Sequence, residues 1–162
     1  MSAEPRSAAV PVMSVRARAV IPDGAGRVLF DRTHHLDRAP FYWLPGGGVE
    51  PGETAEEALG RELIEEASLV IHVRRLLYIS ENLFVESGDY RHEVILYFLA
   101  EAGETLPGAP IDLRHHEWHP PGATPGPFLP PDVAAAVAAD LRDGFARPVQ
   151  HLVTDERPAP AA

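Results

Sequence analysis

A glycine-rich bend followed by an acidic helix is the feature that most constrains how this chain can fold. The stretch "WLPGGGVEPGETAEEAL" (43–59) holds three consecutive glycines, which permit backbone conformations that other residues resist. Thr54 followed by Glu57 is a capping-box pattern, so we expect a helix that begins near Ala55 and runs to about Ala67. The bend and the helix must therefore be direct neighbours in the fold.

The predicted helix places three carboxylates on one face. Glu62, Glu65 and Glu66 have the i, i+3, i+4 spacing, at which like charges repel. A hard cation offsets such repulsion. Mg²⁺, or Mn²⁺ in its place, takes oxygen ligands, and substrate phosphates often complete its coordination shell. The alternative is a solvated acidic helix face. The glycine bend and the embedded Arg61 favour the cation site.

Residues 47–69 resemble the Nudix box, whose pattern is G, five residues, E, seven residues, R-E-apolar-x-E-E-x-G-apolar. The matching positions are Gly47, Glu53, Arg61, Glu62, Leu63, Glu65, Glu66 and Leu69. Ser68 stands where the family has glycine, a residue expected to end the helix with a positive φ that serine tolerates less well. The resemblance extends more weakly over most of residues 13–142, and it implies a Nudix-like α/β/α sandwich with a mixed β-sheet.

The resemblance also implies a function. It indicates a Mg²⁺-dependent hydrolase that cleaves a diphosphate (pyrophosphate) bond in a nucleoside diphosphate linked to another moiety. The three box carboxylates are then metal ligands, with Gly47 structural and with Arg61 and Glu53 joining the loop to the helix through an ion pair. The alternative is a catalytically weak Nudix-like module that binds or senses a nucleotide. Because every box carboxylate is present, we favour catalysis.

Residues outside the box complete the predicted site. Glu93 is the first choice for a general base, because a charged group that opens the apolar strand "HEVILYFLA" needs a reason. Glu62 and Glu65 share the catalytic assignment, and Glu117 is a further candidate for the base. A solvated strand-end carboxylate is the alternative for Glu93. The candidate phosphate contacts are Arg16, Arg18 and Arg32, each of which is as an isolated residue more often a surface arginine.

The remaining pattern predicts one domain between two loose ends. Strands are expected at 12–21, 27–32, 69–80 and 92–100, a helix at 131–144 and a long surface loop at 103–131. Strands and helices mix without regular βαβ alternation, which favours the sandwich over a doubly wound sheet. Small and Pro-rich ends predict a flexible N-terminal tail (1–11) and a flexible C-terminal tail (151–162) around a domain at 12–150.

Composition limits the partners. The formal net charge of −10 argues against a protein that coats duplex nucleic acid. No run of about 18 apolar residues is present, so we expect no membrane-spanning helix. The first residues do not have the pattern of a secretory signal, which favours a cytoplasmic protein. The expected partner is a small nucleotide derivative; a homodimer is compatible with the sequence, which does not decide the oligomeric state, the substrate or the phosphorus that water attacks.

Overall fold

The computed structural model describes residues 12–33, 40–105 and 115–158. Within them the elements are β1 (Val12–Val20), β2 (Val28–Arg32), β3 (Tyr42–Trp43), β4 (Gly46–Gly48), α1 (Ala55–Ala67), β5 (Leu69–Glu86), β6 (Asp89–Thr105), β7 (His116–His119), α2 (Pro131–Arg142) and β8 (Gln150–Asp155). None of the helices in these ranges is both long enough and apolar enough to cross a membrane.

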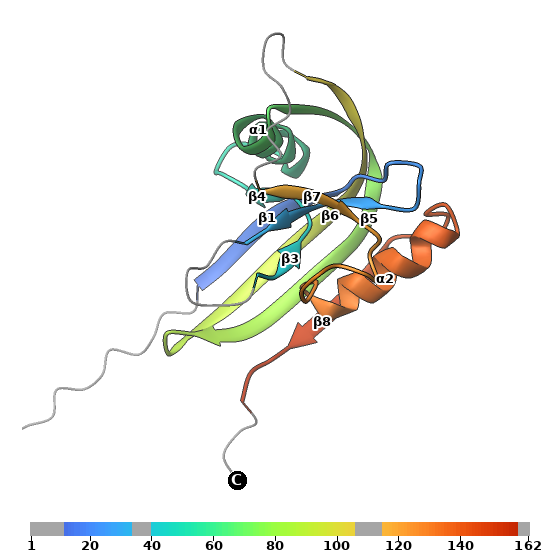
Figure 1. Cartoon of the computed structure of the whole chain (residues 1–162). Coiled ribbons are helices and arrows are strands. Elements are labelled where there is room, and N and C mark those ends of the chain that lie inside the picture. The colour runs from blue at the N-terminus through green and yellow to red at the C-terminus, as the bar shows by residue number, and fades with distance from the viewer. Residues whose placement is uncertain (1–11, 34–39, 106–114, 159–162) are drawn as a thin grey trace, which may run out of the picture.

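The strands form two sheets (Figure 1). The larger sheet has the order β4-β1-β6-β5-β8, and the smaller one has the order β3-β2-β7. In the larger sheet, β1 pairs with β6 and β5 with β8 in parallel, whereas the β1–β4 and β5–β6 pairs are antiparallel. The predicted α/β fold with a mixed sheet is therefore confirmed.

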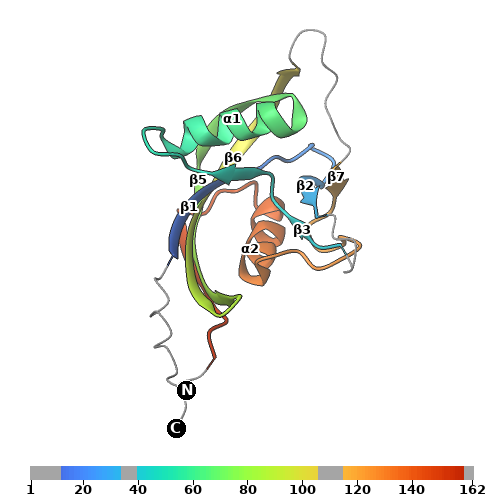
Figure 2. The same ribbon diagram turned by 90° about the vertical axis from the view of Figure 1, so that its left-hand side faces the viewer.

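The two helices lie on opposite faces of the larger sheet (Figure 2). Successive side chains of a strand point to opposite faces, and β1 shows this alternation. Ala17 and Ala19 belong to a buried cluster with Leu63 of α1. Val20 belongs to a second cluster with Val137 of α2. We call these two sides of the sheet the α1 face and the α2 face.

Helix α1 has the predicted bounds and the predicted cap. The Thr54 side chain accepts a hydrogen bond from the backbone N–H of Glu57, and the Glu57 side chain accepts one from the N–H of Thr54. The helix ends at Ser68, whose φ of 53° is left-handed and whose N–H bonds to the carbonyl of Ile64. Serine therefore adopts the conformation expected at the position where the family has glycine.

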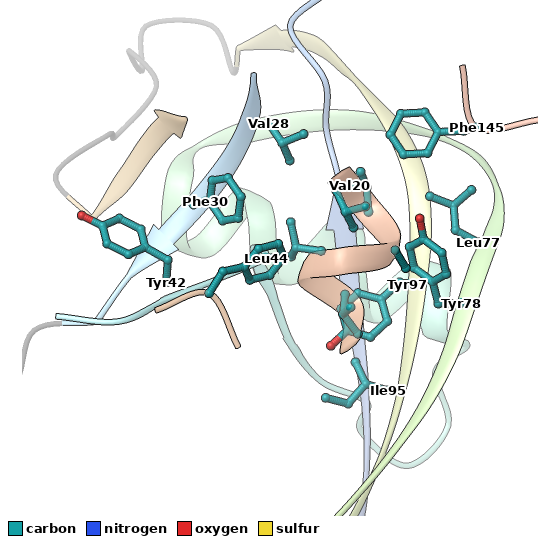
Figure 3. Close-up of a cluster of buried hydrophobic side chains, with 14 residues drawn as sticks. Val20, Val28, Phe30, Tyr42, Leu44, Leu77, Tyr78, Ile95, Tyr97 and Phe145 are labelled. Carbon is teal, nitrogen blue, oxygen red and sulfur yellow. The ribbon is translucent and has the colours of Figure 1, made fainter. Parts of the chain in front are cut away.

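Aromatic rings fill the core on the α2 face (Figure 3). Phe30 of the smaller sheet meets Phe128 edge-on, with ring centroids 4.8 Å apart. Tyr78 and Tyr97 of the larger sheet lie with centroids 6.1 Å apart, and their hydroxyl groups point in opposite directions in Figure 3. The Tyr78 hydroxyl donates to the buried carboxylate of Asp140 at 2.7 Å.

Several predicted bounds differ from the structure. Strands β5 and β6 run well beyond 69–80 and 92–100 because they form one long hairpin. Ser87 and Gly88 at its tip both have positive φ, 53° and 88°, which suits a two-residue turn between twisted strands. The predicted loop at 103–131 contains the end of β6 and all of β7. Strand β7 forms because it pairs with β2.

The C-terminal boundary also differs. Instead of a tail starting at residue 151, residues 150–155 form β8, which pairs in parallel with β5 at the edge of the larger sheet. The physical reason is a set of contacts that the short sequence does not reveal. Leu152 packs against the core on the α2 face, and the Thr154 hydroxyl donates a hydrogen bond to Asp132 at 2.8 Å. The predicted N-terminal tail, residues 1–11, lies outside the described residues.

Candidate active site

Arg61 ties helix α1 to the glycine bend. Its guanidinium donates to both oxygens of Glu53, at 2.6 and 3.1 Å, and to the carbonyl of Gly48 at 3.1 Å. Glu53 also accepts the backbone N–H of Glu50 at 2.7 Å. The hydrogen bonds from Arg61, followed by the one from Glu50, hold the pKa of Glu53 below its usual value. The end of β4, the following loop and the helix are thereby joined into one unit.

The same arginine contacts two of the three box glutamates. Its Nη1 lies 3.0 Å from Glu62 Oε1 and 3.5 Å from Glu65 Oε2. The side chain of Glu62 is only 17% exposed, against 59% for Glu65. Glu62 lies against Gly47, where an added Cβ would come within 2.2 Å of the glutamate's carboxyl carbon. A glycine at this position is therefore what leaves room for the carboxylate.

Glu66 lies near a carboxylate that the sequence analysis missed. Although the Glu66 side chain as a whole is exposed, partial burial of its carboxyl group raises its pKa, and the negative charges of Asp31 and Glu62 raise it further. Asp31 is on β2 and accepts the indole N–H of Trp43 at 2.6 Å. Its signal in the sequence was an acidic residue two positions after Leu29, on the apolar side of a strand. The local negative potential thus comes from α1 and β2 together.

The carboxylates share one face of α1 but do not converge on one point. Across residues 12–33, 40–105 and 115–158, no three His, Asp or Glu side chains are grouped closely enough to hold a metal ion. Arg61 lies between Glu62 and Glu65 and takes part of their charge. Metal binding would therefore require these two side chains to turn from Arg61 toward Glu66.

A cavity of about 380 Å³ lies on the α2 face. Arg16 and Glu93, on the neighbouring strands β1 and β6, both line it and form an ion pair at 3.0 Å. Glu93 has the same strand parity as Ile95, which belongs to the α2-face core. The structure therefore places the first-choice general base in this cavity, on the sheet face opposite to α1.

Trp43 lines the cavity and also contacts Asp31. Its indole N–H contacts Asp31 on one side, while the Arg18 guanidinium lies 4.7 Å from the ring centroid. Arg18 is buried, which lowers its pKa, and it donates to the carbonyl of Leu44. Trp43 also meets the ring of Phe41 edge-on, at a centroid distance of 5.2 Å. Three side chains, those of Asp31, Arg18 and Phe41, thus contact the Trp43 ring.

One residue that lines the cavity has a polar group without a partner among the described residues. Tyr97 is 1% exposed, and its hydroxyl has no hydrogen-bond partner in the part of the chain that the structure describes. Burial is the main cause that raises its pKa, so the hydroxyl stays protonated and can donate. A ligand atom in the cavity is one way to satisfy this donor.

Arg32, the third predicted phosphate contact, belongs to neither place. It is not among the residues that line the cavity, and its Nη1 lies 3.5 Å from Glu117 on β7. Glu117 also contacts His119 at 2.7 Å and accepts the hydroxyl of Tyr42 at 3.2 Å. These contacts, led by the His119 hydrogen bond, lower the pKa of Glu117. The structure therefore brings Arg16 and Arg18 together and leaves Arg32 in a separate cluster.

Comparison with known proteins agrees with this geometry. A family model described as "NUDIX domain" matches residues 13–139. The NAD-capped RNA hydrolase NudC of Pectobacterium carotovorum is 31% identical over 86 residues, which cover 52% of this chain and 31% of the relative. An RNA pyrophosphohydrolase of Dinoroseobacter shibae is 42% identical over 52 residues, which cover 32% of each chain.

A solved structure shows the same fold. The crystal structure of a NUDIX hydrolase from Nitrosomonas europaea has a TM-score of 0.63 and 17% identity, covering 88% of this chain and 79% of that one. The two curated relatives, by contrast, are matched over only about a third of their own length, so their activities as whole proteins do not transfer directly to this chain.

Proposed function

This chain belongs to the NUDIX family, and on that premise we propose that it is a divalent-metal-dependent pyrophosphohydrolase. The proposed reaction is hydrolysis of a diphosphate bond in a nucleoside diphosphate linked to another moiety. The observation that carries the proposal is the acidic face of α1, which Arg61 holds beside the glycine bend through Glu53 and Gly48. The names of the relatives, an NAD-capped RNA hydrolase and an RNA pyrophosphohydrolase, support the same class of reaction.

The chemical type of the available donors, carboxylate oxygens, fits a hard divalent ion. Glu62, Glu65 and Glu66 are proposed as its ligands, because carboxylate oxygens are what Mg²⁺ and Mn²⁺ prefer. Partial burial and then the negative charges of Asp31 and Glu62 raise the Glu66 pKa, and a bound cation would offset those charges. When bound, the ion would supply positive charge against the phosphates and activate water for attack.

The protein's own groups then position the substrate and accept a proton. Arg61 keeps the helix in register with the bend, so that the carboxylates meet the phosphates from one side. Glu62, packed against Gly47, is proposed to accept a proton from the attacking water. Glu93 is the competing base, and its position beside Arg16 in the cavity favours a role in substrate binding instead.

The cavity on the α2 face supports a nucleotide as substrate. Aromatic rings beside a few polar groups suit a planar base, and the volume falls at the lower end of the usual range for small-molecule sites. Arg16 and Arg18 are proposed to contact the substrate near the phosphates. A cytoplasmic location, a homodimer and the absence of duplex nucleic-acid binding stay predictions.

The test is a screen of nucleoside diphosphate derivatives with Mg²⁺ or Mn²⁺, which follows the phosphate-containing products. We expect one class to be hydrolysed, with Glu66→Gln lowering turnover by at least about a hundredfold. Glu56→Gln is the matched control, because Glu56 lies in the first turn of the same helix and has no role in the proposed site. Full activity of Glu66→Gln would remove Glu66 from the metal site.

A nucleotide-sensing module is the second candidate. It is favoured by the contacts that Arg61 makes to Glu62 and Glu65, which leave no ready-made metal group among the described residues. Tight binding of a nucleotide without hydrolysis, at any concentration of either metal, would establish this candidate and reject the enzyme.

A further inference from the structure

Strand β8 lies beyond the part of the chain that the family model matches. The match ends at residue 139, and β8 spans Gln150–Asp155. Even so, two residues of this C-terminal segment, Thr154 and Glu156, line the cavity on the α2 face. One wall of the cavity is therefore made by a segment that the family pattern does not include.

Side chains hold β8 firmly against both the sheet and helix α2. Thr154 donates to Asp132 in the first turn of α2 at 2.8 Å. Gln150 donates at 2.9 Å to Asp140, the buried carboxylate that also accepts the Tyr78 hydroxyl. Each end of the strand is thus bonded to the helix as well as to β5, so the wall has a defined position.

A second set of contacts fixes the opposite side of the strand. His151 and His92 lie 2.7 and 2.9 Å from the two oxygens of Glu81. These two hydrogen bonds, with that from His151 the larger cause, lower the pKa of Glu81. Because Glu81 is on β5 and His92 is on β6, the contacts join three adjacent strands.

The rest of the cavity indicates what kind of group it takes. Phe41, Trp43 and Phe84 supply aromatic surface, and the buried Tyr97 hydroxyl is a donor without a hydrogen-bond partner among the residues that the structure describes. Three of the five charged residues that line the cavity are paired within the protein, and the other two, Arg18 and Glu156, have opposite charges. Arg16 pairs with Glu93, and Glu86 lies 3.3 Å from Arg91. A planar, uncharged heteroaromatic group with a hydrogen-bond acceptor matches these walls.

We propose that β8 is the wall that sets the size of the base accepted by this cavity, with Thr154 as the specificity-determining residue. Thr154 pairs with Asn82 across the parallel strands, and both line the cavity. A bulkier side chain at 154 enters the space that the base would occupy. The proposal rests on the proposed function only in assigning this base to a substrate.

The test compares two variants that add the same ring to the same strand. Thr154→Phe places the ring in the cavity. Val153→Phe places it on the opposite face, where Val153 is 51% exposed. The probe is AMP, titrated calorimetrically in the absence of metal. We expect Thr154→Phe to raise the AMP dissociation constant at least about tenfold, and Val153→Phe to leave it within about twofold of wild type.

A smaller substitution keeps the test valid if the larger one unfolds the protein. If Thr154→Phe does not fold, as judged by thermal unfolding, Thr154→Leu carries the same test with a smaller intrusion. Equal AMP affinity for the bulky Thr154 variant and Val153→Phe would overturn the proposal, as would no AMP binding to wild type.

Failure of this proposal and failure of the proposed function give different results. If the Thr154 variant weakens AMP binding but no nucleotide derivative is hydrolysed, the hydrolase is wrong and the wall stands. If the substrate found in the screen is hydrolysed with an unchanged KM by the Thr154 variant, the wall is wrong and the hydrolase stands. With both correct, the KM of that substrate rises while kcat stays within about threefold of wild type.

Discussion

The two faces of the five-stranded sheet solve different problems. On the α1 face, the groups that matter are charged and close in sequence: the bend, Arg61 and the box glutamates all fall within residues 46–66. On the α2 face, the cavity draws its lining from β1, β3, β5, β6 and the segment around β8. Apart from Asp31 of β2, the residues of the first site come from one stretch of chain. Those of the second come together only when the sheet forms.

The electrostatics of the two faces differ in the same way. On the α1 face, partial burial is the main cause that raises the Glu66 pKa, and the negative charge of Asp31 adds to it. On the α2 face, Arg16 and Glu93 neutralise each other. One face thus carries negative charge that Arg61 compensates only in part, which suits a cation, and the other pairs most of its charges, which suits an uncharged ring.

After Glu66→Gln, the largest expected effect comes from Gly47→Ala on the α1 face. The new Cβ would lie 2.2 Å from the carboxyl carbon of Glu62, so the carboxylate must move. Because that carboxylate is the far end of a flexible side chain, the free energy of unfolding should change by less than about 1 kcal/mol. A displaced catalytic group should nevertheless lower kcat/KM by roughly ten- to a hundredfold.

Gly48→Ala is the matched control for this prediction. A Cβ at Gly48 meets nothing within 4 Å, so activity should stay within about twofold of wild type. The two variants differ by one position in the same strand, and steady-state kinetics with urea unfolding distinguish them. Equal activity in both would show that the position of Glu62 does not matter for turnover.

The contrast between the faces explains what the sequence could predict. The bounds of α1, its capping box and the mixed sheet followed from local patterns and from the box, and the structure confirms them. Asp31 and Trp43 were not assigned to the site, because their contact depends on the pairing of β2 with β3. Local patterns do not encode which strands become neighbours.

The same limit accounts for Glu93 and β8. Strand alternation placed Glu93 at the start of a buried strand, but only the parallel pairing of β1 with β6 brings it to Arg16. The short segment at 150–155 has no strong pattern of its own. Its order depends on β5 along one edge and on Asp132 and Asp140 of α2.

Glu93→Gln tests whether the α2 face binds or catalyses. Removing the charge leaves Arg16 without its carboxylate partner in the cavity. If Glu93 positions the substrate side of the cavity, KM should rise by roughly three- to tenfold and kcat should stay within about threefold. Glu101→Gln is the control, because Glu101 is on β6 like Glu93 but forms an exposed ion pair with Arg74 of β5, away from the cavity.

The opposite kinetic result would reverse the assignment of the two faces. A fall in kcat of more than about a hundredfold with little change in KM, together with loss of the acidic limb of the pH–rate profile, would identify Glu93 as the general base. The catalytic machinery would then extend through the sheet edge to the α2 face, and Glu62 would serve the metal alone.

Ser68→Gly should have the smallest effect, and it tests whether the departure from the family pattern concerns the turn or the chemistry. Ser68 has a φ of 53°, which costs a residue with a Cβ about 1 kcal/mol relative to glycine. Replacing Ser68 with glycine removes this strain, but the greater freedom of glycine in the unfolded chain offsets part of the stabilisation. The free energy of unfolding should therefore rise by roughly 0.5 kcal/mol, measured in urea. Ser87→Gly, at the same φ of 53° in the distant hairpin turn, should give a similar gain. Because Ser68 ends α1 after the carboxylates, kcat/KM should be unchanged in both variants; a change confined to Ser68→Gly would show that the helix end positions Glu66.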